Sequence, residues 1–148
     1  MNFECHFVPI NLKARLNLFL NNVSTNGIFL FELKKDENIQ LLQFIEVNFI
    51  DSKSIKKLNK LFRNIDKATD VLSFNLIHTG EIDLCLEIIK DNSNNINIDF
   101  YTEVERCIIH GILHIIGYDH VEKLTPETLS KEPMFLLQEN ILSQCHIK

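Results

Sequence analysis

The sequence has only three arginines among its 148 residues. No stretch approaches the roughly 18 uncharged apolar residues that a membrane-spanning helix needs, so we expect no membrane partner. The N-terminal residues lack a basic segment followed by an apolar one, and no signal peptide is expected. The four cysteines stand far apart without a C-x-x-C pair. This spacing predicts reduced thiols in a cytoplasmic protein rather than a disulfide framework.

The chain also lacks an internal repeat, a linker and a low-complexity tail. Its length suits one ordinary domain, and its 45% of apolar side chains excludes a disordered chain. Strand-like and helix-like patterns alternate along the sequence, which predicts a single domain over residues 1–148 of class α/β or α+β. In this domain we expect a small mixed sheet of about four strands packed with helices, one of which carries histidines.

Apolar alternation and helical spacing predict the individual elements. The predicted strands cover residues 3–8, 42–50, 71–74 and 82–88, with a turn at 79–80. The predicted helices cover residues 11–22, 100–116 and 134–142, together with a helix that Asp51 or Ser52 caps and that ends near Asn64. Residues 21–27 and 90–97 are predicted loops, 28–33 fit either a strand or a helix, and 119–133 are irregular with Pro126 and Pro133 as possible helix starts.

The net charge of -5 argues against an indiscriminate nucleic-acid binder, and DNA is not an expected partner. The charge is uneven, however, because residues 51–67 hold six basic and two acidic residues, whereas the remainder holds nine basic and eighteen acidic ones. In the helix after Asp51, one face is apolar and the opposite face carries lysines. That face is either simply solvated or a track for an RNA backbone; the candidate RNA-binding residues are Lys53, Lys56, Lys57, Lys60 and Lys67. The apolar face is formed by Ile55, Leu58, Phe62 and Ile65.

Three of the six histidines lie in the eleven residues HGILHIIGYDH, at positions 110–120. His110 and His114 are four residues apart, so both rings leave the same face of a helix. In a continuous helix His120 would lie about 240° around the axis from His114. Gly117 lies between them and is typical of a helix end. The spacing and the helix break together predict one metal site formed by His110, His114 and His120.

Three neutral imidazoles suit zinc, with nickel and copper as weaker candidates. They leave a fourth position for a water molecule, whose pKa the ion lowers from about 15.7 to roughly 7, so such a site performs hydrolysis. A second interpretation is a closed structural site with Cys107 as fourth ligand. We favour Cys107 as a small buried thiol, because one helical turn would otherwise supply three crowded ligands.

The histidine spacing equals that of the metzincin motif H-E-x-x-H-x-x-G-x-x-H. In this sequence Gly111 stands where that motif has its general-base glutamate. Peptidase chemistry is therefore disfavoured, unless Asp119 or another acid approaches the metal in the fold. No general base is visible in the sequence.

The segment HGILHIIGYDH and the upstream run LNKLFRNIDKATDVLSF (58–74) resemble the two signatures of the YbeY-type endoribonucleases, the bacterial rRNA maturation factors. The resemblance covers residues 40–142. It implies that the three histidines bind one zinc ion per chain and that Arg63 is needed for activity. The sequence departs from the family pattern at two positions: Asn75 stands where proline is usual, and Glu81 stands where aspartate is usual.

The resemblance further implies a metal-dependent endoribonuclease that cleaves single-stranded rRNA. The process would be 16S rRNA 3′-end maturation and late-stage 70S ribosome quality control, with the ribosome or its small subunit as partner. A rival interpretation is a non-catalytic zinc-containing ribosome-assembly factor, which a fourth protein ligand would favour. A metallopeptidase is a further alternative.

Arg63 is also singled out by its own chemistry, since it is the only arginine in the basic segment. A guanidinium can hold a phosphate through two hydrogen bonds, whereas a lysine cannot. The alternative is a solvated charge near the end of a helix. Arg106 could likewise hold a phosphate or pair with Glu103, and Asp119 could orient a ligand histidine.

Overall fold

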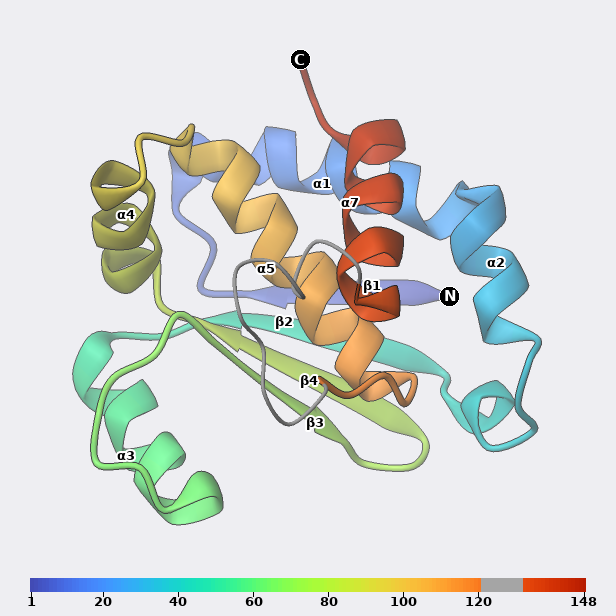
Figure 1. Cartoon of the computed structure of the whole chain (residues 1–148), viewed down its shortest axis with the longest axis horizontal. Coiled ribbons are helices and arrows are strands. Elements are labelled where there is room, and N and C mark those ends of the chain that lie inside the picture. Colours follow the sequence, from blue (N-terminus) through green and yellow to red (C-terminus); the bar gives the residue numbers. More distant parts are fainter. Residues whose placement is uncertain (121–131) are drawn as a thin grey trace.

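The computed structural model describes residues 1–120 and 132–148. Its centre is a four-stranded mixed sheet with the order β1-β2-β4-β3 (Figure 1). The strands are β1 (Asn2–His6), β2 (Phe44–Phe49), β3 (Val71–Asn75) and β4 (Thr79–Leu84). β1, β2 and β4 are parallel, and β3 pairs antiparallel with β4. This sheet confirms the predicted fold class.

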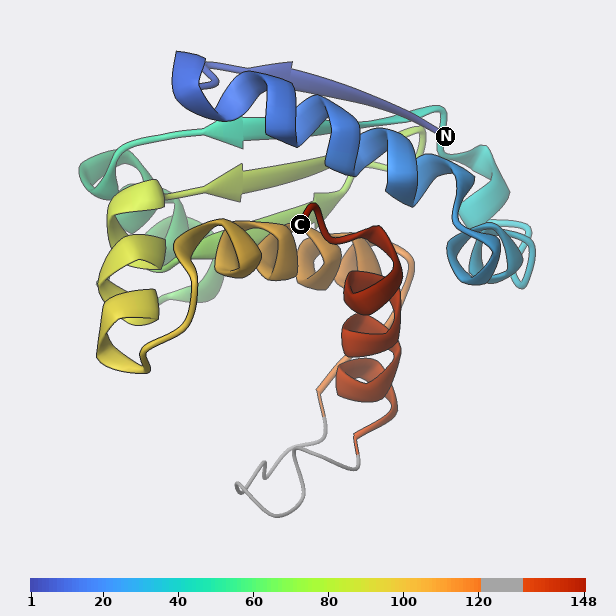
Figure 2. The ribbon, with the colours of Figure 1, turned by 90° about the horizontal axis from the view of Figure 1, so that it is seen from above.

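Most helices pack on one face of the sheet, as Figures 1 and 2 show. α5 crosses β3 and β4, and α7 packs on α5 and contacts α1. The helices are α1 (Ile10–Thr25), α2 (Gly27–Leu33), α3 (Ser52–Arg63), α4 (Leu86–Asn95), α5 (Phe100–Ile115) and α7 (Pro133–Cys145), with a short 3₁₀ turn η1 (Ile39–Leu41). Among the described residues, no helix is both long and apolar enough to cross a membrane.

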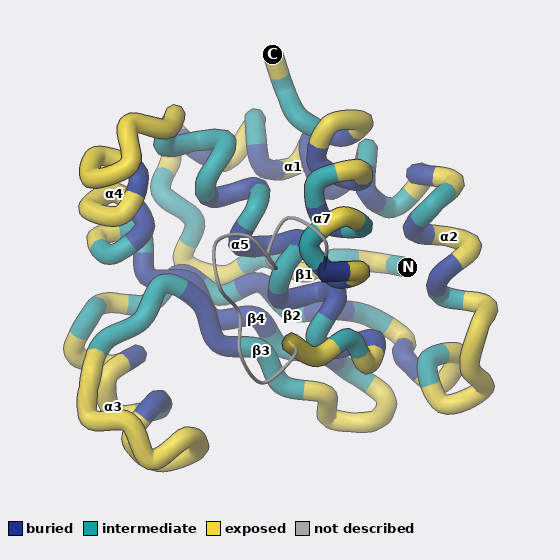
Figure 3. The backbone as a smooth tube through the Cα atoms, viewed as in Figure 1, coloured by how far each residue is buried: buried dark blue, intermediate teal, exposed yellow. Residues whose placement is uncertain are grey.

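The main core lies between this sheet face and α5. Alternate residues of the central strands, such as Ile45, Val47 and Ile82, are fully buried there. α5 is buried over much of its surface, whereas α3 is largely exposed (Figure 3). A smaller core on the other side of the sheet joins Ile55 of α3 to Leu72 and Cys85. α3 is therefore attached to the opposite face by few buried side chains.

The predicted helix signals act as expected at three places. The Asp51 carboxylate accepts a hydrogen bond from the Ser54 amide at 2.7 Å and caps α3. Pro133 opens α7. α5 ends at Ile115, and Gly117 follows with φ of +108°, a backbone conformation that glycine adopts without strain.

Several predicted boundaries are wrong. α1 continues to Thr25, and Asn26 alone separates it from α2, so residues 21–27 are not a loop and residues 28–33 are helical. β4 ends at Leu84, and the Asn-rich segment forms most of α4 because Ile89 and Ser93, four residues apart, are both buried. The turn lies at residues 76–78 instead of 79–80. Most of the segment 119–133, including Pro126, lies outside the described residues.

The amphipathic pattern of α3 is confirmed only in part. Ile55 is buried, but Phe62 and Ile65 are 60% and 48% exposed. Asn59 is buried in their place, and its side-chain amide donates a hydrogen bond to the Lys67 carbonyl at 2.8 Å. Asn59 therefore attaches the segment that follows α3 to the helix, at a position that the apolar pattern did not include.

Candidate metal centre

The three histidines of the motif converge at the end of α5. The Nε2 atom of His110 lies 3.1 Å from Nε2 of His114 and 3.3 Å from Nε2 of His120. His110 and His114 project from the same helical face, and the break at Gly117 lets the chain turn so that His120 meets them. The prediction that the helix breaks and brings these rings together is confirmed.

Each ring is fixed from behind by an acceptor for its Nδ1 atom. His110 Nδ1 lies 2.8 Å from Gln138 Oε1, and His114 Nδ1 lies 2.8 Å from the Tyr118 carbonyl. His120 Nδ1 lies 3.0 Å from Oε1 of Glu132. Such acceptors favour the tautomer with the proton on Nδ1. Three Nε2 lone pairs then point at one centre, where they repel one another unless a cation lies between them.

The spacing of the three nitrogens fits zinc. Nitrogens at about 2.0–2.1 Å from a tetrahedral zinc ion lie about 3.3–3.4 Å apart. The observed separations from His110, 3.1 and 3.3 Å, are close to this value. Burial also lowers the pKa values of His110 and His114, which favours the neutral imidazole that a metal requires.

Within the described part of the chain, no cysteine or carboxylate joins this histidine cluster. Cys107 is buried, and its sulfur lies 3.8 Å from Oδ2 of Asp70. Burial raises the pKa of the Cys107 thiol well above its ordinary value, and the thiol contacts Asp70 and not the histidine cluster. The residues described here therefore favour an open site over a closed one with Cys107.

A cavity of about 250 Å³ opens in front of the histidines. Arg63, from the last turn of α3, lines it although it is far from the histidines in sequence. The prediction that Arg63 faces the same cleft is confirmed. The other lining residues outside the histidine cluster are Thr69, Asp70, Val71 and Ser73. A guanidinium and a three-histidine centre thus share one small polar space.

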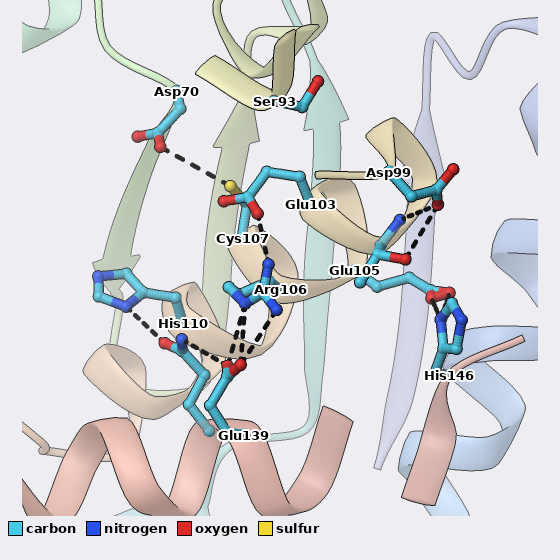
Figure 4. A network of polar contacts seen from close by, with 12 residues as sticks. Asp70, Ser93, Asp99, Glu103, Glu105, Arg106, Cys107, His110, Glu139 and His146 are labelled. Atoms are coloured by element: carbon cyan, nitrogen blue, oxygen red, sulfur yellow. Dashed lines mark hydrogen bonds and ion pairs between the residues drawn. The ribbon is translucent and has the colours of Figure 1, made fainter. Parts of the chain in front are cut away.

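Two other candidates from the sequence have different roles. Arg106 is held by Glu103 and by Glu139, whose carboxylate accepts hydrogen bonds from Arg106 at 3.0 Å (Figure 4). It is therefore committed to an ion-pair network and not available to a phosphate. Asp119 is 94% exposed and lies 3.9 Å from His114 Nδ1, which is instead held by the Tyr118 carbonyl.

Gln138 and Glu132 were missed by the sequence analysis. Gln138 is a buried polar residue in a helix whose inward face is otherwise apolar, and this mismatch is the signal that could have identified it. Glu132 is buried just before α7 and gives no comparable sequence signal. Both lie in or directly before α7 and far from α5 in sequence, so their contacts with His110 and His120 depend on how α7 docks.

The lysines of the basic segment are all exposed, and none of them lines the cavity. Lys56 and Lys60 point toward Asp66, with Nζ–carboxylate distances of 4.0 and 3.8 Å. Their role toward RNA remains a prediction.

The absent glutamate of the metzincin motif has a structural explanation. A Cβ atom on Gly111 would lie 3.1–3.2 Å from side-chain atoms of Ile82, which is fully buried. Position 111 therefore faces the sheet, and a glutamate there would enter the apolar interface between α5 and β4 instead of the metal centre.

Asn75, where the family pattern has proline, has a defined function in the fold. Its side-chain amide donates a hydrogen bond to the Ile115 carbonyl at 2.9 Å, and its Oδ1 accepts one from the Ile77 amide at 2.8 Å. It therefore pairs a free carbonyl at the end of α5 and joins the histidine helix to the β3–β4 turn.

Fold and site together define a class of protein: a small α/β domain in which three histidines that could hold a metal ion share a cavity with an arginine. Over residues 20–146 the chain matches the family described as Endoribonuclease YbeY, and it belongs to that family. The resemblance inferred from the two motifs is confirmed.

Relatives match over most of the chain. An endoribonuclease YbeY of Borreliella afzelii is 33% identical over 147 residues, which cover 88% of this chain and 94% of the relative. Another from Ureaplasma parvum is 37% identical over 117 residues, or 74% of this chain and 72% of the relative. The solution structure of TM1509 from Thermotoga maritima is similar with a TM-score of 0.57 and 29% identity, covering 97% of this chain and 88% of that one.

Proposed function

We propose that residues 1–148 form one YbeY-like domain that acts as a cytoplasmic, zinc-dependent endoribonuclease specific for single-stranded RNA. Its process is 16S rRNA 3′-end maturation and late-stage 70S ribosome quality control. The observation that carries the proposal is the convergence of three histidines with Arg63 around one cavity, in a chain that belongs to the YbeY family.

His110, His114 and His120 are the residues that would hold one zinc ion per chain. When bound, zinc supplies Lewis-acid polarisation of a phosphoryl oxygen and makes an attacking water more acidic. Gln138, the Tyr118 carbonyl and Glu132 keep the three rings in the tautomer and orientation that this requires.

Arg63 would bind the phosphate that is to be cleaved. Its planar fork suits two oxygens of one phosphate, and its charge offsets the negative charge that develops in the transition state. Because Arg63 comes from α3, and His110 and His114 come from α5, the phosphate would be positioned between two elements that pack on opposite faces of the sheet.

The basic face of α3 would contact neighbouring phosphates of the RNA strand. Lys53, Lys57 and Lys67 are exposed on the same segment as Arg63. Residues 51–67 hold six basic and two acidic residues, whereas acidic residues outnumber basic ones in the rest of the chain. In this proposal the polyanion that contacts the surface is RNA of the ribosome or its small subunit.

The test combines metal content with cleavage of a single-stranded RNA by wild type, His114→Ala and a control, His78→Ala, which changes an exposed histidine outside the cluster. Wild type and the control should bind one zinc ion and cleave RNA, but not single-stranded DNA or duplex RNA. His114→Ala should lose both properties. Stoichiometric zinc without any cleavage would favour the ribosome-assembly factor, and peptide hydrolysis the metallopeptidase.

A further inference from the structure

A second cavity, of about 200 Å³, adjoins the metal centre. Among the residues that the structure describes, it shares His110 and His120 with the cavity that contains Arg63. These two rings are stacked, with centroids 4.9 Å apart and planes inclined by 25°. The two cavities therefore adjoin the same pair of rings.

The chemistry of this cavity differs from that of the first. Its remaining lining comes from Glu132 and from the first turns of α7, with Met134, Phe135 and Gln138. The Gln138 amide is already engaged, because its oxygen meets His110 and its nitrogen donates to Glu139 at 3.2 Å. Met134 is only 1% exposed, so among the described lining residues of α7 the half-buried ring of Phe135 is the apolar surface that a ligand can contact.

One polar atom in this lining lacks a partner. Oε1 of Glu132 meets His120, but Oε2 has no hydrogen-bond partner among the residues that the structure describes. The Glu132 side chain is only 1% exposed, so water does not readily satisfy this oxygen. The cavity therefore suits a flat, mainly apolar group, and the buried carboxylate beside it disfavours a phosphate.

We propose that this cavity receives one nucleobase of the RNA, adjacent to the phosphate bound by Arg63, with the Phe135 ring as its stacking surface. The inference rests on the proposed function and adds a substrate subsite to it. The cavity is smaller than the roughly 300–1,000 Å³ of pockets for drug-sized ligands, which limits it to one ring system. Each nucleobase is a flat ring system of this kind, and its π-face can stack on an aromatic side chain.

This subsite gives a physical reason for preferring single strands. A base must leave its neighbours to enter the cavity, and in a duplex it must also break its base pair. Stacking on an aromatic ring tolerates any base, because each has a π-face. The subsite should therefore select unstacked RNA without selecting a particular sequence.

The experiment compares wild type with Phe135→Leu, which keeps an apolar side chain but removes the planar ring, and with Phe135→Tyr, which keeps the ring. Leu136→Ala is the matched control, because Leu136 follows in the same helix, is exposed and does not line the cavity. Each protein is tested on an RNA oligonucleotide and on versions with a single abasic position moved along the strand. Binding by fluorescence anisotropy, with and without zinc, accompanies the cleavage rates and zinc content.

For wild type, Phe135→Tyr and Leu136→Ala, an abasic nucleotide next to the cleaved phosphate should lower kcat/KM and affinity about 5- to 150-fold. Phe135→Leu should show a similar loss with intact RNA, little further loss with abasic RNA, and full zinc content. An equal abasic effect in wild type and Phe135→Leu would overturn the subsite. Absence of cleavage by zinc-loaded wild type would instead overturn the proposed function, while the binding comparison would still decide the subsite.

Discussion

The Nδ1 atom of His120 lies 3.0 Å from Oε1 of Glu132, a carboxylate whose side chain is only 1% exposed. A buried carboxylate costs free energy unless a partner offsets the loss of hydration. The imidazole is that partner, and the carboxylate in return makes Nε2 of His120 a better metal ligand. Because Glu132 lies at the start of α7, the metal centre depends on a helix that contributes no ligand itself.

Substitution of Glu132 should therefore weaken metal binding without removing a ligand. We expect Glu132→Ala to lower zinc affinity about 10- to 100-fold, measured by competition with a chelating dye. Glu132→Gln should have a smaller effect, because the amide oxygen still accepts from Nδ1. Glu87→Gln, an exposed acidic position at the start of α4, is the control and should bind zinc like wild type. Unchanged affinity in Glu132→Ala would show that the carboxylate does not support the metal.

Arg63→Lys should separate metal binding from activity. The lysine keeps the positive charge but loses the planar fork that holds two phosphate oxygens. We expect kcat to fall on the order of 10²- to 10³-fold while zinc content stays at one ion per chain. Lys90→Ala, which removes an exposed charge from α4, should leave both quantities unchanged. Full activity of the Arg63→Lys protein would show that Arg63 does not bind the phosphate and is only a solvated charge at the end of a helix.

The ion pairs of Lys56 and Lys60 with Asp66 predict that substitutions of the lysines and of the aspartate change RNA affinity in opposite directions. All three side chains are more than half exposed, so these pairs contribute little to stability. Asp66 nevertheless competes with RNA phosphates for both lysines. Asp66→Asn should therefore strengthen RNA binding, and Lys56→Glu with Lys60→Glu should weaken it and reduce the slope of log affinity against log salt by about 1.4, at about 0.7 per phosphate contact.

The matched control changes two exposed lysines elsewhere, Lys13→Glu with Lys90→Glu, and alters the net charge equally. Equal effects of the two double substitutions would show that only net charge matters and that the basic face of α3 is not an RNA track.

The sequence predicted the histidine centre well because its determinants are local. The spacing of His110 and His114 and the helix end at Gly117 depend on one short segment and on backbone geometry. The contacts of Gln138 and Glu132 could not be predicted in this way, because they depend on the docking of α7 onto α5. α4 was missed because its Asn-rich sequence has weak helix propensity, and burial of Ile89 and Ser93 outweighs that preference.

Gly111→Glu would restore the metzincin pattern in sequence but should not create a peptidase. The new side chain would enter the interface between α5 and Ile82, where a charge is neither hydrated nor paired. We expect the free energy of unfolding to fall by about 3 kcal/mol or more in urea titrations. Gly27→Glu is the control, because a side chain at that exposed position meets open space. A stable Gly111→Glu protein that hydrolyses peptides would contradict this view of the helix face.

The sheet face opposite α5 carries a group of acidic residues that makes stability depend on pH. Burial, followed by repulsion from Asp83, raises the pKa of Glu81 from 4.5 to about 7. Glu46 stands directly opposite Glu81 on the neighbouring strand. The folded state therefore favours the protonated form of Glu81 more than the unfolded chain does. The stabilisation is fully present below pH 4.5 and is lost as the pH rises through about 7.

Glu81→Gln should remove this dependence, because glutamine resembles the protonated carboxyl group and does not ionise. We expect the variant to match wild type near pH 4.5 and to exceed its free energy of unfolding at pH 8 by on the order of 1 kcal/mol, a value reduced for solvent screening of a partly exposed group. Urea titrations at pH 4.5, 6 and 8 provide the measurement, with Glu87→Gln as the control for loss of an acidic charge. A gain of equal size at all three pH values would mean that the amide improves packing and that Glu81 is not titrating in the folded protein.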